Sequence, residues 1–187
     1  MNPKDVLREE HGRIMKMLAV LQRFFATLAD LGEGEAQDFG ALMEFFEIYV
    51  DRYHHGKEEQ LLFPALSRAQ TAKIDSLISS LIDDHRQARM GMELLKFNVV
   101  TLPSCGEADR NEFCERAENY VDLLRRHIRK ENSELLPLIE ERLSATERLQ
   151  MAGQFHDLEK VTLGSGGLET FLANVHRLSL KYLLQSI

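Results

Sequence analysis

Tryptophan is absent from this 187-residue sequence, and proline occurs only four times. The β-branched residues are scattered and do not alternate with polar ones, so β-strands have little support and we expect an all-α protein. Cysteine is equally scarce, since Cys105 and Cys114 lie nine residues apart and form no CxxC pair. This spacing argues against a disulfide framework and against a zinc site built from thiolates.

Long apolar segments and an excess of basic residues are also missing. The sequence has no run of about 18 apolar residues that could cross a bilayer, and its first residues, MNPKDVLREEHGR, lack the apolar region of a secretory signal. Thirty acidic residues against 23 basic ones give a formal charge of −7, whereas nucleic-acid binding needs clustered Lys and Arg. We therefore expect a cytoplasmic protein without a nucleic-acid or membrane partner.

What the sequence does contain is helical periodicity. Apolar residues recur at spacings of three and four in four long segments, residues 4–30, 38–65, 72–98 and 109–142. Asp38 is a candidate N-cap for the second segment. Because each apolar stripe needs partners on two sides, the four segments predict an antiparallel four-helix bundle. A hydrophobic content of 44% is enough for one domain with a single core.

The last part of the chain predicts two shorter helices packed on the bundle. Ser144 and Glu147 have the spacing of a capping box, and the GSGG stretch separates the two pieces. We expect residues 1–142 to form the bundle and residues 143–187 to form a helical extension of the same domain.

An internal repeat relates the two halves of the bundle. The sequence EEH at 9–11 matches DDH at 83–85, and His54, Glu58 and Pro64 recur with identical spacings in the second half, at residues 127, 131 and 137. The halves are therefore predicted to be two copies of one helical hairpin. Measured from the proline, His54 and Glu58 belong to the repeated set, and the neighbouring His55 and Glu59 do not.

Six polar residues fall on the apolar stripes and are the candidate metal ligands: His11, His54, Glu58, His85, His127 and Glu131. Such a set is strongly unfavourable in a core unless something compensates. Residues at i and i+4 share one helix face, so each His-x-x-x-Glu pair presents a nitrogen and an oxygen together. Two such pairs with two further histidines form a two-metal site of the bundle type.

The donor set favours iron over manganese or zinc. Two six-coordinate ions offer about twelve positions, of which four histidines and two bridging glutamates fill about eight. A bridging oxo or hydroxo group takes two more, so one or two positions stay open for dioxygen, peroxide or nitric oxide. We therefore expect two iron ions as the cofactor.

The pattern H…HxxxE…H…HxxxE with the stretch HHGKEEQLLFP resembles the hemerythrin-like (HHE cation-binding) domain over residues 1 to about 142. The resemblance implies a four-helix bundle with a non-haem di-iron centre bridged by two carboxylates. All six candidate residues match the family's ligands. Oxygen-carrying hemerythrins have a second histidine four residues from the one in the third helix, where this chain has Leu81 and Arg89 around His85. Iron-sulfur repair proteins share this four-His, two-Glu set, but this chain lacks their paired cysteines near the N-terminus.

Other polar residues allow two interpretations each. His55 and Glu59 are expected to be partly exposed and outside the ligand set, because they turn about 100° away from their neighbours. Glu10 and Asp84 are either surface charges or groups that orient a ligand imidazole. Tyr120 is expected in the core. The tail residues are expected to have surface or capping roles, the alternative being an added ligand: His156, Glu159 and His176.

Three functions fit this site. The first is a di-iron protein that binds or reduces small oxidants in oxidative or nitrosative stress, with an oxidoreductase or peroxidase-type activity left open. The second is an iron- or oxygen-responsive regulatory module whose tail helices report metal occupancy to a protein partner. The third is iron storage or donation.

Overall fold

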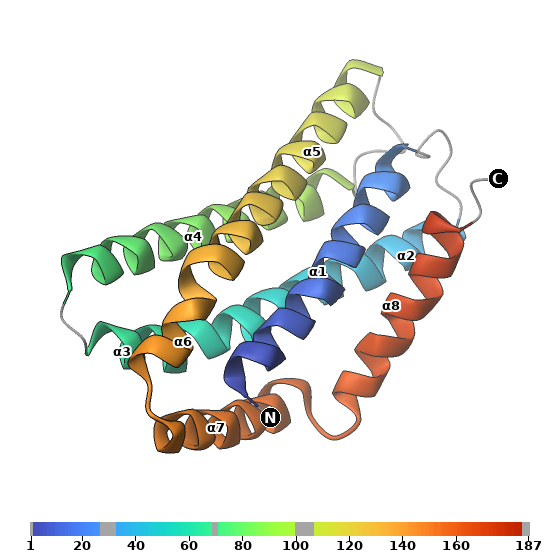
Figure 1. Cartoon of the computed structure of the whole chain (residues 1–187). Coiled ribbons are helices and arrows are strands. Elements are labelled where there is room, and N and C mark those ends of the chain that lie inside the picture. The colour runs from blue at the N-terminus through green and yellow to red at the C-terminus, as the bar shows by residue number, and fades with distance from the viewer. Residues whose placement is uncertain (1, 27–32, 69–70, 100–106, 185–187) are drawn as a thin grey trace.

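The computed structural model describes residues 2–26, 33–68, 71–99 and 107–184 (Figure 1). Within these ranges the chain is helical, with no strand, so the all-α prediction is confirmed.

The helices of the first 142 residues form four rods. The first rod is α1 (Pro3–Ala26) and the third is α4 (Ala72–Val99). The second rod runs through α2 (Glu33–Glu44), η1 (Phe45–His55), η2 (Glu58–Leu62) and α3 (Phe63–Ser67). The fourth runs through α5 (Glu107–Lys130), η4 (Glu131–Leu135) and α6 (Leu136–Arg142).

The four rods contact one another in a ring. Helix α5 packs against α1 and α4, and η1 contacts both α1 and α4. Their apolar stripes form two separate hydrophobic clusters, one around Phe24, Phe46 and Leu124 and the other around Leu7 and Leu81. In the sequence of each rod the predicted ligands lie where one cluster gives way to the other, with Ile128 of the first cluster directly after His127, so the polar site crosses the core at one level.

Two rods contain π-helical turns at equivalent places. In η2 the N–H of Phe63 bonds to the carbonyl of Glu58, five residues earlier, and in η4 the N–H of Leu136 bonds to the carbonyl of Glu131. Pro64 and Pro137 follow directly. Because proline has no N–H and its ring excludes the carbonyl four residues before it, an α-helical ladder cannot continue unchanged there. Both predicted ligand glutamates therefore open a widened turn.

The tail forms α7 (Ala145–Leu163) and α8 (Gly167–Leu183). The predicted capping box is present: Glu147 N–H donates to Ser144 Oγ at 3.3 Å, and Ser144 N–H donates to the Glu147 carboxylate at 2.9 Å. The turn between the helices uses Gly164 and Gly166 at φ 73° and 75°, a region that glycine adopts readily. Helix α7 contacts η1, η2 and α1, and α8 lies along α1.

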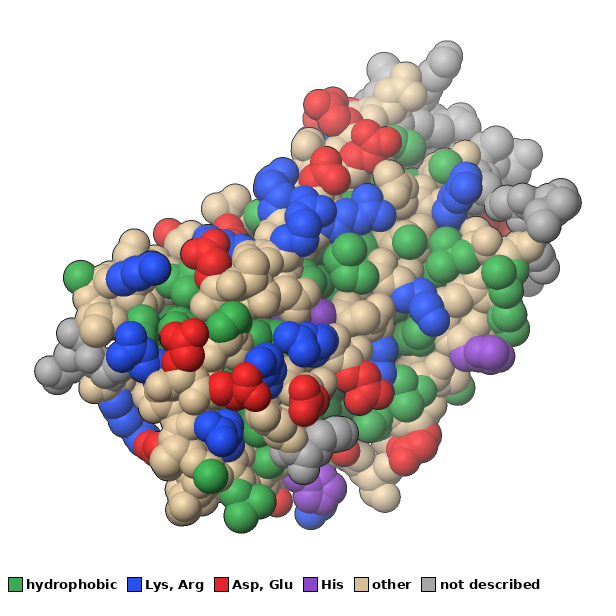
Figure 2. Space-filling view, viewed as in Figure 1, with side chains coloured by type: hydrophobic (Ala, Val, Ile, Leu, Met, Phe, Trp, Pro, Cys, Tyr) green, Lys and Arg blue, Asp and Glu red, His purple; other side chains and the backbone are tan. Residues whose placement is uncertain are grey.

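The prediction that Asp38 caps the second helix is wrong, because α2 begins at Glu33 and Asp38 lies inside it. The Asp38 carboxylate is buried and accepts hydrogen bonds from α8: from Arg177 at 2.5 Å, Lys181 at 2.6 Å and Tyr182 at 2.8 Å. This carboxylate therefore fastens α8 to α2. On the face presented by α1, α5, α6 and α8, basic and acidic side chains are interspersed (Figure 2).

Candidate metal centre

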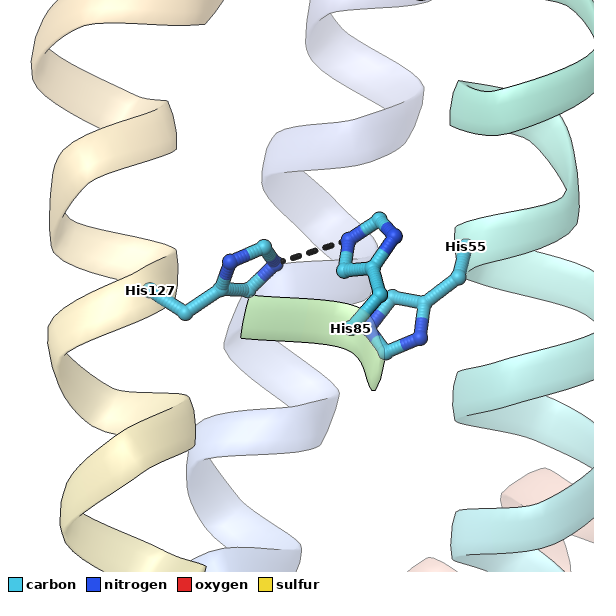
Figure 3. A group of neighbouring side chains, drawn as sticks. All are labelled: His55, His85 and His127. Carbon is cyan, nitrogen blue, oxygen red and sulfur yellow. Dashed lines mark hydrogen bonds between the residues drawn. The ribbon is translucent and has the colours of Figure 1, made fainter. Parts of the chain in front are cut away.

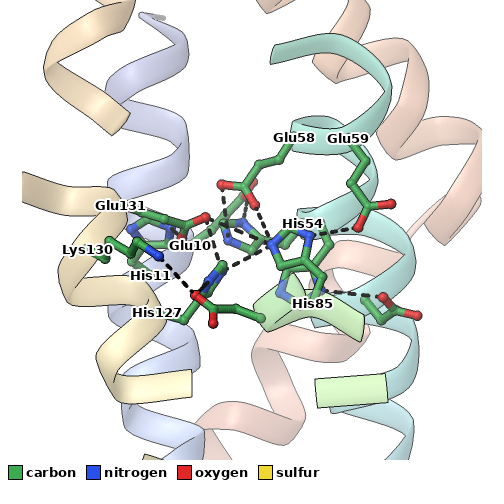
Figure 4. Close-up of polar contacts among 12 residues, drawn as sticks. Glu10, His11, His54, Glu58, Glu59, His85, His127, Lys130 and Glu131 are labelled. Carbon is green, nitrogen blue, oxygen red and sulfur yellow. Dashed lines mark hydrogen bonds and ion pairs between the residues drawn. The ribbon is translucent and has the colours of Figure 1, made fainter. Parts of the chain in front are cut away.

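All four rods contribute to the candidate centre, and its six side chains are each at most 2% exposed. They fall into two groups of four that share Glu58 and Glu131 (Figure 4). The first group adds His11 and His54, and the second adds His85 and His127. One potential ligand atom from each member of a group lies within 4.8 Å of the others. The structure thus brings together all six residues that the sequence pattern selected.

Each glutamate faces both histidine pairs. For Glu131, Oε2 lies 3.1 Å from His11 Nε2 and Oε1 lies 3.1 Å from His127 Nε2. Glu58 has the same arrangement at longer range. Its Oε1 lies 3.9 Å from His54 Nε2 and its Oε2 lies 3.4 Å from His85 Nε2. Two oxygens of one carboxylate pointing to opposite sides are suited to bridging two cations.

The donor atoms are buried without the hydrogen bonds that such atoms need. Among the described residues, no hydrogen-bond partner exists for Nε2 of His11 and His54 or for either oxygen of Glu58 and Glu131. An unsatisfied buried polar atom costs about 1–3 kcal/mol, and more when it is charged. Metal coordination would satisfy these atoms together, so the residues present fit a pair of cations.

The second histidine pair has a separation that suits one ion. His85 Nε2 and His127 Nε2 are 3.1 Å apart (Figure 3). Two nitrogens that each lie about 2.0–2.1 Å from one ion, at a right angle, are about 3 Å apart. These two imidazoles are therefore already spaced as neighbouring ligands of one cation.

The outer nitrogen of His11, His54 and His85 has an oxygen within hydrogen-bond distance, which fixes the ring and leaves Nε2 facing inward. Among the described residues Nδ1 of His127 has no hydrogen-bond partner, and Asp84 is near it only as an ion-pair partner. Asn132 Oδ1 lies 2.9 Å from His11 Nδ1, and Glu10 Oε2 lies 2.9 Å from His54 Nδ1. In the second half, Glu59 Oε1 lies 2.7 Å from His85 Nδ1, and Asp84 Oδ2 lies 3.5 Å from His127 Nδ1.

These outer contacts are equivalent in the two halves of the sequence. Glu10 and Asp84 occupy matching positions 74 residues apart, as Glu59 and Asn132 do at 73. In each half a lysine also forms an ion pair with the acidic residue: Lys57 contacts Glu10, and the matching Lys130 lies 3.5 Å from Asp84. Glu10 therefore orients His54, and Asp84 lies beside His127 as an ion-pair partner, each on the other helix of its own hairpin.

Burial and neighbouring charges shift several pKa values here. Burial alone would raise the pKa of Glu131, but His127 and His11 outweigh it and hold that pKa well below its usual range. Burial would lower the pKa of His127, but Glu131 and Asp84 raise it to about 10. In the metal-free protein the imidazole therefore holds a proton that a cation must displace, so metal binding is coupled to proton release.

His55 does not lie where it was expected. It is only 2% exposed, whereas the sequence predicted partial exposure. Its ring stacks on His85 with 3.8 Å between centroids and 15° between planes. The cause is local: His55 ends the π-helical segment η1, whose wider turns rotate successive side chains by less than the α-helical 100° or so. Glu59 is 29% exposed at its side chain, as expected, and holds His85.

The remaining sequence candidates lie away from the centre. Tyr120 is buried in the core, as expected, and His156 and His176 are exposed. Glu159 accepts a hydrogen bond from Tyr53 at 2.8 Å. Cys114 is half-buried, and Cys105 lies outside the described residues.

Asn132 and Lys57 were not selected from the sequence. A signal was present, because Asn132 matches Glu59 and Lys57 matches Lys130 in the repeat alignment. The repeat alone does not say which histidine each residue faces, since the acceptors of His11 and His85 come from the opposite hairpin.

No helix in the described part of the chain combines the length and the apolar character needed to span a membrane.

Comparison with known proteins gives both a family and distant relatives. The chain is 22% identical over 173 residues to uncharacterized proteins of Mycobacterium tuberculosis (Rv1995) and Mycobacterium bovis (Mb2018), covering 92% of this chain and 67% of theirs. It is 26% identical over 157 residues to a protein of Nostoc sp. named DNA nickase, covering 83% of this chain and 38% of that one. The family model described as the hemerythrin HHE cation-binding domain matches residues 2–139. The chain belongs to this hemerythrin HHE cation-binding family.

Proposed function

We propose that this chain is a di-iron protein that binds or reduces a small oxidant such as dioxygen, peroxide or nitric oxide. The observation that carries the proposal is that each of two buried glutamates presents one oxygen to each of two histidine pairs. The proposed ligands are His11 and His54 for one ion, His85 and His127 for the other, and Glu58 and Glu131 as bridges.

Iron, when bound, supplies the redox chemistry. The residues supply neutral nitrogen donors, carboxylates that offset the charge of the cations, and an apolar surrounding that excludes water. Six protein ligands leave about four of about twelve positions for a bridging group and a small ligand. Open positions favour iron over a closed structural zinc site.

The same proposal extends to the architecture. We interpret the first 142 residues as an antiparallel four-helix bundle built from two copies of one hairpin, with α7 and α8 as a helical extension of that domain. The matching contacts made by positions 73 or 74 residues apart support the duplication. The nickase activity named for the Nostoc protein is not proposed here, because the alignment covers 38% of that protein.

The test is the metal content of purified variants. Wild-type protein from iron-supplemented cells should hold about two irons per chain, the number that two four-residue donor groups predict. Glu131→Ala should lose both ions because Glu131 faces both histidine pairs. His156→Ala, which changes an exposed histidine on α7, is the matched control and should retain both. Full iron content in Glu131→Ala would contradict the ligand assignment.

A metal-responsive regulatory module is a second candidate, favoured by a series of contacts that connects the ligand His54 to α7. The Nδ1 of His54 is hydrogen-bonded to the Glu10 carboxylate, and Glu10 forms an ion pair with Lys57. The Lys57 ammonium lies 3.4 Å from the centroid of the Tyr53 ring. Tyr53 in turn donates to Glu159 on α7. Iron-dependent protection of α7 from hydrogen exchange, without turnover of any oxidant, would favour this function over the first.

A further inference from the structure

A cavity of about 220 Å³ lies beside the candidate centre, among η1, α4 and α5, and opens to the surface at the exposed Arg52 and Glu93. Its lining includes Val50, Asp51, His55, Ala88, Arg89 and Tyr120. Val50, Ala88 and Tyr120 are each at most 4% exposed, so this part of the wall is apolar and lies inside the protein. The volume is enough for a molecule of a few atoms and too small for most organic substrates, which occupy pockets of about 300–1,000 Å³.

His55 separates this cavity from the candidate ligands. Its ring lies against His85 and meets the ring of His127 edge-on, with centroids 5.6 Å apart and planes at 82° (Figure 3). One ring nitrogen from each of these three histidines lies within 4.8 Å of the other two. A small molecule in the cavity would therefore need only to pass the His55 ring to reach the second histidine pair.

The charged groups of the cavity wall are paired with opposite charges: Arg52 contacts Glu47 at 2.5 Å, and Glu93 lies 3.7 Å from Lys96. Arg89 donates to Asp51 and to Glu59, each at 2.7 Å, and its side chain is 40% exposed. A guanidinium held by two carboxylates offers little attraction to an anion. The combination of a neutralised charged wall and an apolar interior favours a small uncharged molecule over an ion.

The two halves of the sequence differ at this point. The residue 73 positions after His55 is Ile128, which is buried at 3% exposure. Glu10, Lys57 and Glu59 have polar counterparts in the second half, Asp84, Lys130 and Asn132, whereas His55 does not. This difference makes Ile128 a matched control for His55.

We propose that uncharged diatomic molecules, dioxygen or nitric oxide, reach the metal pair through this cavity, on the side of His85 and His127, and that the His55 ring controls their passage. This inference rests on the proposed di-iron function and adds the route and its controlling residue.

The probe is nitric oxide, mixed rapidly with the reduced iron-loaded protein while the visible absorption change on binding is followed. Ala88→Leu places three more carbon atoms in the cavity and should slow binding about tenfold, and His55→Ala should speed it about tenfold, each a barrier change near 1.4 kcal/mol. Ile128→Ala removes comparable volume at the matching position and should leave the rate within about twofold. Iron content is measured for every variant.

The possible failures differ. If nitric oxide binds but Ala88→Leu and His55→Ala both match wild type in rate, this entrance is overturned and the di-iron function stands. If iron-loaded wild type responds to neither nitric oxide, dioxygen nor peroxide, the proposed small-ligand function and the entrance are both overturned. Should His55→Ala lose iron, the Ala88→Leu rate alone decides, and an unchanged rate overturns the route.

Discussion

The four inward histidines have contacts at both ring nitrogens, and at Nδ1 of His11, His54 and His85 the contact is a hydrogen bond. The inner nitrogen faces a glutamate of the centre, and the outer nitrogen faces an oxygen on another helix. This second contact fixes the tautomer and the orientation of the ring, and loss of such a partner typically weakens metal binding by 10- to 100-fold. The acceptors should therefore influence metal affinity although they touch no metal.

Asn132→Leu tests this at one position. Leucine has a similar shape to asparagine but accepts no hydrogen bond, so His11 would lose the contact that its Nδ1 makes at 2.9 Å. We expect iron affinity to fall about 10- to 100-fold with little change in fold. The iron affinity is measured by competition against a chelator. Ser133→Ala, at the next position and exposed, is the control, and equal affinities in the two variants would refute the orienting role.

At this scale the six candidate ligands chosen from the sequence lie together in the structure, and of the four outer oxygen-bearing residues only Asn132 was not singled out from the sequence. His11, Glu58 and Glu131 could be chosen from the sequence because each is a polar residue that interrupts the apolar stripe of a single helix. The pairing of Asn132 with His11 depends on the relative height of two helices, which no single stripe contains. His55 was misplaced because its predicted direction assumed α-helical turns in a segment that is π-helical.

Among the helical elements, the π-helical turns η2 and η4 have the most direct connection to the site. Each begins at a glutamate of the candidate centre and is followed by a proline at its second next position after the turn. Such turns occur often at functional sites. Here the widened turn sets the height and direction of the carboxylate, so the prolines should influence metal binding through backbone geometry.

Pro64→Ala would restore an N–H and allow an α-helical ladder through this turn. We expect unchanged helical content by circular dichroism, but iron affinity lower by about tenfold, the scale for changes that reorient a ligand. Pro3→Ala provides the control, because Pro3 opens α1, where a missing N–H costs no hydrogen bond. Wild-type affinity in Pro64→Ala would show that the turn forms without the proline.

The start of α7 gives an element-scale prediction that is independent of the metal. Ser144→Ala removes both the acceptor for Glu147 N–H and the hydroxyl that donates to the Glu147 carboxylate at 2.7 Å. We expect a loss of about 1 kcal/mol, measured by urea unfolding. A change no larger than that of the exposed Thr146→Ala would mean that the box contributes no stability.

The helices themselves were largely predictable. Residues 72–98 and 109–142 were expected to be helical, and the structure has helices at Ala72–Val99 and at residues 107–142. The start of the second rod was not predicted correctly. Asp38 is a residue type that often caps helices, but here its carboxylate accepts a hydrogen bond from Arg177, which lies 139 residues further along the chain. A local signal cannot reveal that partner.

For the whole molecule, the attachment of α8 should depend on pH. Burial raises the pKa of Asp38, but hydrogen bonds from Lys181, Arg177 and Tyr182 outweigh it and lower that pKa below the ordinary 3.8. A depressed folded pKa gives stability that is present above the unfolded value and is lost as pH falls through the folded one. This contribution is therefore complete at neutral pH and is lost as the pH falls from about 3.8 through the lower pKa of the folded protein.

Asp38→Asn should be less stable than wild type at pH 7, and the difference between the two proteins should shrink as the pH falls below the ordinary aspartate pKa. Urea unfolding across a pH series measures it. A difference that stays constant down to acid pH would show that Asp38 acts through packing and not through its charge.

We propose that one molecule holds two ions bridged by Glu58 and Glu131. Mössbauer spectroscopy of protein loaded with iron-57, together with the iron content per chain, tests it most directly. We expect two irons per chain whose oxidised spectra show a spin-coupled pair, because carboxylates that reach both histidine pairs would place the ions next to each other. One iron per chain, or two that are magnetically independent, would contradict it.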